Sequence, residues 1–259
     1  MRNFFFIFMK ETRSYFNSPI AFVVITIFTI LTGYYFYNIF AAFSTISFQA
    51  QTDPMIANKY GALNITENVV RPFIGTLSGV MLIMLPMLTM RVFSEEKKTG
   101  TIELLLTFPV QDIEAILGKF AGCMGIFGIM LVLSFPSILL VEFFGDPEWG
   151  VILSGYLGLI MMGCAFVSLG VFMSTLTENQ IVAAVLTFAA LLVFYLISYS
   201  AGFVGEGLGR VLEYLSFDYH IRNFVKGVID SSDVIYYILF TIFFLFLSMR
   251  SLESKRWRA

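Results

Sequence analysis

The sequence predicts an all-α integral membrane protein with six transmembrane helices, and three observations predict this fold class. Of the 259 residues, 58% are hydrophobic and only 13% are charged. The mean hydropathy of +0.84 is far above that of an ordinary soluble domain. The apolar residues also gather into six blocks separated by polar segments, and a membrane-spanning helix needs about 20 such residues. We expect one transmembrane domain over residues 1–259.

Residues 1–18 precede the first apolar block and mix three cations, Arg2, Lys10 and Arg13, with aromatic side chains. On a helix these residues form an apolar side with a basic margin, which is typical of helices that lie in the membrane interface. We predict such a helix here, in contact with membrane lipid. The alternative is an unstructured basic lead-in to the first span.

Six spans follow, and a polar segment separates each from the next. They cover residues 19–40, 72–90, 120–141, 151–176, 180–204 and 234–250. Residues 43–68 are polar and predict an exterior loop. The last span is short for a full crossing, so its helix should recruit residues from either flank. Apolar residues also recur with roughly helical spacing in residues 205–233, which predicts one or two helices in the outer interface.

Small residues mark one face of the third span. Gly118, Gly122, Gly125 and Gly128 recur every three or four residues. In a transmembrane helix this spacing usually allows another helix to pack closely. We therefore expect a tight helix contact along this face.

The distribution of Lys and Arg orients the spans. Six crossings place both termini on one side, and most of the 16 Lys and Arg residues fall in the termini or in residues 91–119. Positively charged segments stay inside. Both termini and residues 91–119 are therefore expected on the cytoplasmic side of a bacterial cytoplasmic (inner) membrane.

Chemically reactive groups are scarce in the sequence. It contains no GxxxxGK[ST] or HExxH motif, a single His, and two cysteines, Cys123 and Cys164, inside apolar blocks. We expect no catalytic residue, cofactor, metal or disulfide in this chain, and no nucleic-acid partner. The apolar cores of the spans also lack ionisable residues, which argues against an ion-driven carrier. Energy for any transport must then come from another protein.

Residues 91–119 carry the densest charge, in the run RVFSEEKKTGTIELLLTFPVQDIEAILGK. Gly100 and Pro109 bracket a short helical pattern, in which Thr101 can cap the first turn and Glu103 lies near the helix start. An apolar surface follows from Leu104, Leu105 and Leu106. A helix of about two turns is not stable alone in water, so we expect a partner protein to pack against it.

The four residues before this pattern, Glu95, Glu96, Lys97 and Lys98, could orient such a contact by their charge. A permease powered by a separate ATPase needs an element of this kind between its spans. The alternative is a solvated loop whose charges only enforce the membrane topology.

The same run resembles the signature of the type-2 ABC exporter permeases, E-x-x-x-G-T-x-E-x-L-L-x-T-x-P-V followed by G-K. Here the signature starts at Glu96 and ends at Val110, with one residue fewer between Glu103 and Thr107 than in the pattern, and Gly118 and Lys119 are the later pair. Gln111 stands where many members have a Ser or Thr helix cap. Before the last span, a second set resembles the gliding-motility-associated and NosY-like branch of the family: Tyr219, His220, Phe224, Gly227, Val228, Ile229 and Asp230.

The resemblance implies a type-2 ABC exporter permease fold with an N-terminal elbow helix, six spans, a cytoplasmic coupling helix and exterior gate helices over residues 205–233. It implies two copies of an ABC ATPase as partners, with ATP and Mg on that ATPase, and a second permease copy, identical or homologous. The residues that would couple to the ATPase are Glu95, Glu96, Lys97, Gly100, Thr101, Glu103, Leu104, Leu105, Leu106 and Pro109.

Two further sites are implied by position. Glu178, Asn179 and Gln180 would make a minor cytoplasmic contact, and an exterior gate would include His220, Phe224, Gly227 and Asp230. A lone His at an interface is more often a hydrogen-bonded structural residue than a metal ligand, and we expect the same of His220.

The expected function is that of a membrane permease subunit in an ATP-driven exporter or extruder. The alternative is a membrane anchor or mechanotransmission subunit that moves no solute and uses the same ATPase to exert force on an auxiliary envelope protein.

Overall fold

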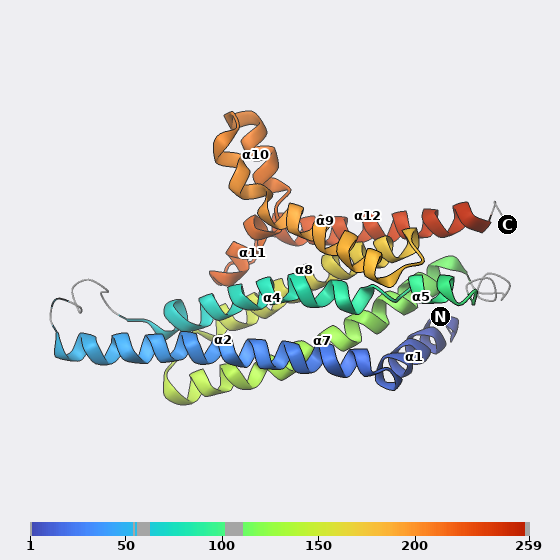
Figure 1. Cartoon of the computed structure of the whole chain (residues 1–259). Helices are drawn as coiled ribbons and strands as arrows, with labels where there is room; N and C mark the ends of the chain where they lie inside the picture. The colour runs from blue at the N-terminus through green and yellow to red at the C-terminus, as the bar shows by residue number, and fades with distance from the viewer. Residues whose placement is uncertain (1, 54, 56–62, 102–110, 257–259) are drawn as a thin grey trace.

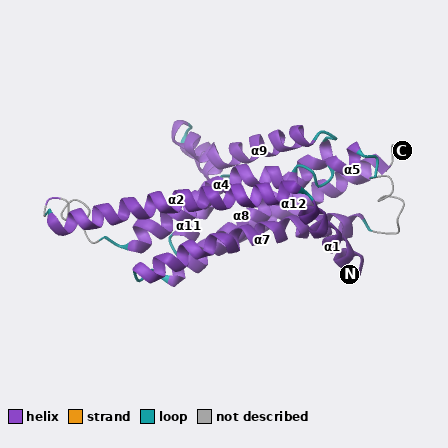
Figure 2. Cartoon of the chain, turned by 60° about the horizontal axis from the view of Figure 1, so that its bottom comes forward, coloured by secondary structure: helices purple, strands orange, loops and turns teal. Residues whose placement is uncertain are grey.

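The computed structural model in Figure 1 describes residues 2–53, 55, 63–101 and 111–256. All the regular elements in these residues are helices, and Figure 2 shows no strand among them. Six helical segments are long and apolar enough to cross a membrane. The predicted all-α class with six spans is therefore confirmed.

The first two helices are α1 (Arg2–Asn17) and α2 (Pro19–Thr52), which meet at Ser18. The Ser18 hydroxyl accepts a 3.4 Å hydrogen bond from the N–H of Ile20. A serine cap followed by a proline in the first turn favours the start of a helix. One helix thus ends and the next begins around a single residue, where the chain changes direction (Figure 1).

The predicted loop over residues 43–68 is wrong in its first part, because α2 continues to Thr52. Polar side chains there bond to their own helix. The Thr45 hydroxyl donates to the Ala41 carbonyl at 2.9 Å, and the Thr52 hydroxyl donates to the Gln49 carbonyl at 3.0 Å. Such bonds satisfy a hydroxyl without interrupting the helix. The polarity of this stretch is therefore compatible with helix.

The remaining elements follow in chain order. They are the π-helix η1 (Thr66–Val70), α4 (Arg71–Thr89), α5 (Ser94–Lys98), α7 (Asp112–Phe144), α8 (Trp149–Leu176), α9 (Gln180–Ser200), the 3-10 helix η2 (Ala201–Phe203), α10 (Glu206–Tyr214), α11 (Phe217–Val225) and α12 (Ser231–Arg256).

Helices α2, α7 and α12 are longer than the spans predicted over residues 19–40, 120–141 and 234–250. Hydropathy marks the apolar centre of a span, whereas the helix itself continues into flanking polar residues. Helix α12 gains residues at both ends, as predicted for a span that is too short to cross on its apolar core alone.

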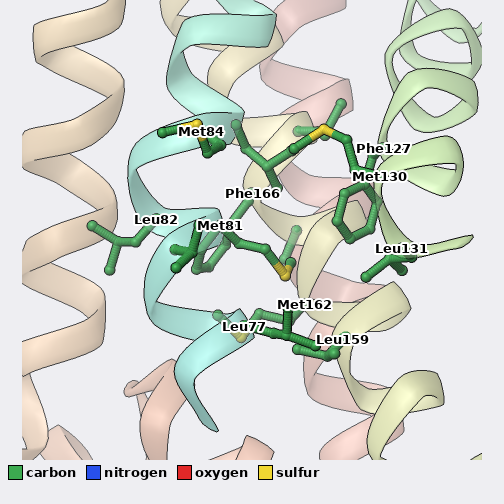
Figure 3. Close-up of a cluster of buried hydrophobic side chains, with 14 of the residues drawn as sticks. Leu77, Met81, Leu82, Met84, Phe127, Met130, Leu131, Leu159, Met162 and Phe166 are labelled. Carbon is green, nitrogen blue, oxygen red and sulfur yellow. The ribbon is translucent and has the colours of Figure 1, made fainter. Parts of the chain in front are cut away.

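The centre of the bundle is formed by α4 and α8. The most apolar windows of the spans that contain them are each 67% buried, against 28% for α2, 17% for α9 and 22% for α12. Met81 of α4, Met130 of α7, and Met162 and Phe166 of α8 pack together there (Figure 3). Methionine side chains adapt to irregular gaps between helices. The outer faces of α2, α9 and α12 stay apolar and exposed, as suits surfaces that meet lipid or another membrane chain.

Two short helices occupy residues 205–233, for which the spacing of apolar residues predicted one or two helices. Helix α11 packs against α8 and buries Phe217 and Phe224, whereas α10 projects from the bundle beside the end of α9 (Figure 1). Helices α1 and α5 and the last turns of α12 lie together at the other end (Figures 1 and 2), which is called the α1 end below.

Candidate functional site

The glycines of α7 lie against α1. A Cβ atom added to Gly118 would lie 2.7 Å from Cγ2 of Ile7, and one added to Gly122 would lie 2.9 Å from the Cβ of Glu11. Both distances are shorter than real side chains allow, so glycine is what lets the two helices approach. Gly128 has nothing within 4 Å. The predicted close contact is confirmed at Gly118 and Gly122, and the partner helix is α1.

A buried ion cluster, here called the Lys119 cluster, joins α1, α5 and α7 next to these glycines. The ammonium of Lys119 lies 2.8 Å from Oε1 of Glu11 and 3.0 Å from Oε1 of Glu96. It also donates a 2.9 Å hydrogen bond to the Val92 carbonyl and lies 5.1 Å from the centre of the Phe93 ring. The Lys119 side chain is only 2% exposed. A buried charge of this kind needs its partners, because removing one typically costs about 3–5 kcal/mol.

Tyr15 ties α1 to α4 and α7 on the next turn. Its hydroxyl donates to the Leu88 carbonyl at 3.0 Å and lies 3.0 Å from Sγ of Cys123. The guanidinium carbon of Arg91 lies 4.4 Å from the centre of the Tyr15 ring, within range of a cation–π interaction. Burial raises the pKa of the Tyr15 hydroxyl well above its usual value, so this group stays a protonated donor.

The turn between α4 and α5 is fastened to α8 by Ser174. Its hydroxyl oxygen accepts hydrogen bonds from the N–H groups of Phe93 at 2.8 Å and Ser94 at 3.0 Å. The Lys97 ammonium donates to the Thr175 carbonyl on the same helix. Backbone N–H groups at the start of a helix have no partner in that helix, and α8 supplies one from outside. The segment around α5 is therefore held by α1, α7 and α8 together.

The residues predicted to face an ATPase fall into two groups in α5. Glu95 and Lys98 are exposed, whereas Glu96 joins the Lys119 cluster and Lys97 turns toward α8. Gly100 ends the helix with φ +72°, a left-handed conformation that glycine adopts readily. Gly100 thus lies just after the end of α5, whereas its predicted role is to bracket, with Pro109, a helix that lies outside the described residues.

The rest of the predicted coupling set is only partly visible. The Thr101 hydroxyl lies 2.9 Å from that of Thr99, in the turn after α5. The other predicted residues lie outside the described part of the chain: Glu103, Leu104, Leu105, Leu106 and Pro109. The helix predicted between Gly100 and Pro109 is thus untested, and the roles of these residues toward an ATPase stay predictions.

The predicted minor contact lies between α8 and α9, both of which α5 touches. The Asn179 side-chain oxygen caps α9 by accepting from the N–H groups of Ile181 at 2.9 Å and Val182 at 3.4 Å. Glu178 is exposed and Gln180 is half-buried. In this short loop Asn179 caps α9, whereas Glu178 is exposed and takes no part in the cap.

His220 lies in a separate buried network at the junction of α11 and α12. Its Nδ1 lies 2.6 Å from Oδ1 of Asp233, and its Nε2 lies 2.8 Å from the Tyr214 carbonyl oxygen. The other carboxylate oxygen of Asp233 accepts a 2.8 Å hydrogen bond from Asn223, and the imidazole stacks on Tyr236 with 3.9 Å between ring centres. Because the carbonyl can only accept, Nε2 carries a proton, and a second proton lies between Nδ1 and Asp233.

In this geometry both ring nitrogens of His220 are hydrogen-bonded within the protein, as expected for a lone histidine at an interface. Among the described residues, no group of three or more His, Cys, Asp and Glu side chains could hold a metal ion. The other predicted gate residues also shape this junction. The Phe224 carbonyl accepts from the Ser154 hydroxyl at 2.8 Å, Gly227 adopts φ +90°, and an Asp230 oxygen accepts from the N–H of Ser232 at 2.9 Å.

The hydrogen bond from Ser232 holds the pKa of the exposed Asp230 carboxyl below its usual value. Whether this junction acts as a gate stays a prediction.

The sequence reasoning missed the parts of the site that come from other segments. Glu11, Tyr15, Ser174 and Asp233 carried no motif. One signal was available: Glu11 shares the helical face of Phe4, Phe8 and Tyr15, and an acid on an apolar face usually has a buried partner.

Comparison with known proteins agrees with this architecture. No curated protein matches the chain. The sequence profile described as ABC-2 family transporter protein matches residues 5–252, which include the Lys119 cluster, the His220 network, the first five spans and the sixth up to Leu252. Since the match extends over nearly the whole chain, the protein belongs to the ABC-2 family of transporter proteins.

Proposed function

We propose that this chain is the permease subunit of an ATP-driven exporter or extruder, and that the segment around α5 receives motion from a separate ATPase. Membership of the ABC-2 family supports a membrane permease subunit of an ABC transporter. The proposal adds that two ATPase copies, carrying ATP and Mg, bind at the α1 end. It also adds that both termini face the cytoplasm of a bacterium.

The observation that carries the proposal is the attachment of α5 to three other helices. Glu96 is bound to Lys119 of α7, and Lys119 is bound to Glu11 of α1. Ser174 of α8 holds the turn that leads into α5. Helices that are joined by buried ion pairs and hydrogen bonds move together unless those contacts break. A push on the exposed side of α5 would therefore move α1, α7 and α8 together.

The exposed side of α5 offers charges of both signs to a partner. Glu95 and Lys98 are exposed on a helix whose other charged side chains, Glu96 and Lys97, contact residues inside the protein. Charges at the rim of a contact orient the partner and speed its association. The apolar centre of the contact would come from Leu104, Leu105 and Leu106.

A second permease copy, identical or homologous, completes the proposed complex. The windows of α2, α9 and α12 leave most of their apolar surface uncovered by this chain. Lipid covers part of such a surface, and a membrane partner would cover the rest.

The test uses the full-length chain together with the ATPase that co-purifies with it. Replacing Glu103→Lys should abolish the stimulation of ATP hydrolysis by the permease while the complex still inserts into the membrane. Glu213→Lys makes the same charge change on the exposed surface of α10, far from the proposed contact, and should leave the stimulation unchanged. Stimulation by Glu103→Lys equal to that of the unmodified chain would contradict the proposal.

The second candidate is a force-transmitting anchor, and the resemblance of Tyr219–Asp230 to the gliding-motility-associated and NosY-like branch favours it. Both candidates use the same ATPase contact. Flux of a candidate solute into sealed vesicles, compared with vesicles that hold an ATPase-dead complex, separates them, because an anchor predicts ATP hydrolysis without flux.

A further inference from the structure

A groove of about 580 Å³ lies between α1 and the α4–α5 turn, on the side of α1 away from α7. Helix α1 lines it with Phe6, Met9, Lys10 and Arg13, which recur every three or four residues and therefore share one helical face. Arg91 and Glu95 line the opposite wall. This cavity is called the basic groove below.

The groove carries more positive than negative charge. Its three cations are Lys10, Arg13 and Arg91, and its one carboxylate is Glu95. Arg13 is exposed and forms no ion pair with any residue that the structure describes. Arg91 is held by its contact with the Tyr15 ring, and no carboxylate within the described ranges neutralises it. Lys10 lies 3.5 Å from Glu96, yet its side chain is 64% exposed. An anionic group would find cations on both walls.

The groove also lies at the level of the membrane surface. Its floor includes Ser18, the cap of the first spanning helix. The first span begins at the next residue, so the groove borders the point where the chain enters the hydrocarbon region. Exposed Phe6 lines the groove. Phe5 and Phe16 are exposed on α1, next in sequence to groove-lining residues, and Phe22 is exposed in the first turn of α2, after the cap Ser18. Aromatic rings at this level contact lipid tails, while cations contact the headgroups.

We propose that the basic groove binds the headgroup of an anionic phospholipid. The phosphate lies between Lys10, Arg13 and Arg91, and the acyl chains run along the exposed phenylalanines into the bilayer. The apolar side chains beside the cations distinguish a lipid from a free phosphate ion, which would gain nothing from them. The bound lipid then fixes α1 from the side opposite the glycine contact with α7.

This site also bears on coupling, which is the one point that rests on the proposed function. Lys10 and Arg91 border the residues that fasten α5, since Lys10 lies near Glu96 and Arg91 lies in the turn between α4 and α5. A lipid held by these cations stabilises the position of α1 that the Lys119 cluster requires. Lipid binding itself is measured without an ATPase, so failure of the binding test and failure of the proposed function remain distinguishable.

The experiment measures phospholipid retained by the purified full-length chain. The protein is reconstituted in vesicles of phosphatidylcholine with phosphatidylglycerol, extracted gently, and analysed by native mass spectrometry. The variant Lys10→Gln/Arg13→Gln should retain roughly thirtyfold less phosphatidylglycerol, because each cation near an anionic surface contributes about fivefold. Retention of phosphatidylcholine should not change. Both side chains are exposed, so the fold should survive, as size-exclusion chromatography and circular dichroism would verify.

The matched control is Arg210→Gln/Lys226→Gln, which removes two exposed cations from the far end of the molecule. It should retain as much phosphatidylglycerol as the unmodified chain, and Lys10→Arg should retain it too. Equal retention by the two double variants would overturn the proposal. Inorganic phosphate that displaces the lipid at equal concentration would also overturn it, because the site would then recognise a free anion.

Discussion

The ammonium of Lys119 on α7 lies 2.8 Å from the carboxylate of Glu11 on α1, although the two residues are 108 positions apart in the sequence. Both side chains are nearly buried, and the carboxylate of Glu96 on α5 binds the same ammonium. An N-terminal helix that would otherwise rest on the membrane surface is thereby built into the bundle. Three segments far apart in the chain depend on one side chain.

Replacing Lys119→Met should destabilise the protein by about 3–5 kcal/mol, because the buried Glu11 would lose its ammonium partner and the half-buried Glu96 would keep only Lys10 at 3.5 Å. Unfolding in detergent, followed by circular dichroism, measures the change. Arg250→Met breaks the exposed pair with Glu253 and should cost less than about 1 kcal/mol. The destabilisation of the double variant Glu11→Gln/Lys119→Met should be smaller than the sum of the two single-variant destabilisations. The reason is that Glu96 would then be the only carboxylate left at the position of the missing ammonium. Equal losses in Lys119→Met and Arg250→Met would refute the role of the cluster.

Replacing Gly122→Ala should displace α1 from α7, because the new methyl would lie 2.9 Å from the Cβ of Glu11. Overpacking of this kind typically costs about 1–3 kcal/mol. Gly128→Ala on the same helix has open space around it and serves as the control, which should be nearly neutral. Distances between spin labels on α1 and α7 would report the displacement. Equal stability and equal spin-label distances in the two alanine variants would contradict the close contact between α1 and α7 at Gly122.

Replacing Ser174→Ala should release the turn between α4 and α5, because the N–H groups of Phe93 and Ser94 lose their acceptor. Leaving a buried donor unsatisfied costs about 1–3 kcal/mol. Hydrogen exchange of a peptide that covers this turn should accelerate. Ser168→Ala is the control, since that hydroxyl donates only within its own helix, to Ala165 at 2.8 Å. Its exchange profile should match the unmodified chain, and unchanged exchange in Ser174→Ala would argue against the fastening of α5.

Replacing Asp233→Asn should loosen α11, because the carboxylate holds both His220 at 2.6 Å and Asn223 at 2.8 Å. We expect a loss of about 1.5–3 kcal/mol, the usual range for hydrogen bonds to a charged group, with faster hydrogen exchange in α11. Asp218→Asn, which breaks only a pair with Arg222 on the same helix, should have a small effect. A chelator should leave the stability of the unmodified chain unchanged, since both ring nitrogens of His220 are already bound. Destabilisation by the chelator would reopen a metal role.

The sequence predicted the helical class, the number of spans and the tight face of α7, because each depends on local composition or spacing. It did not predict the length of α2, where Thr45 and Thr52 satisfy their hydroxyls within the helix. It also did not predict the Lys119 cluster. Lys119 and Glu96 were assigned to a charged segment facing a partner, and only the folded arrangement brings Glu11 to them.

The residues of the family signature show the same difference between local requirements and tertiary contacts. Gly100 lies just after the end of α5 in a left-handed conformation, which is a local requirement that favours glycine. Glu96 and Lys97 have the composition of surface residues, yet tertiary contacts turn both inward. Whether a charged side chain is buried depends on partners from other helices, and the spacing of residues along the sequence does not predict which helices will supply them.

The 34 residues of α2 make a rod about 51 Å long. Even at a tilt of about 40°, the upper end of the usual range, the rod spans about 39 Å along the bilayer normal, beyond a hydrocarbon core of about 30 Å. With the first span taken to start at Pro19, the surplus of α2 extends past the hydrocarbon core on the opposite side and ends at Thr52. Among the described residues, the end of α2 extends farther from the α1 end than α4 and α7 do (Figure 1), so a protein that binds at this side would contact α2 before those helices.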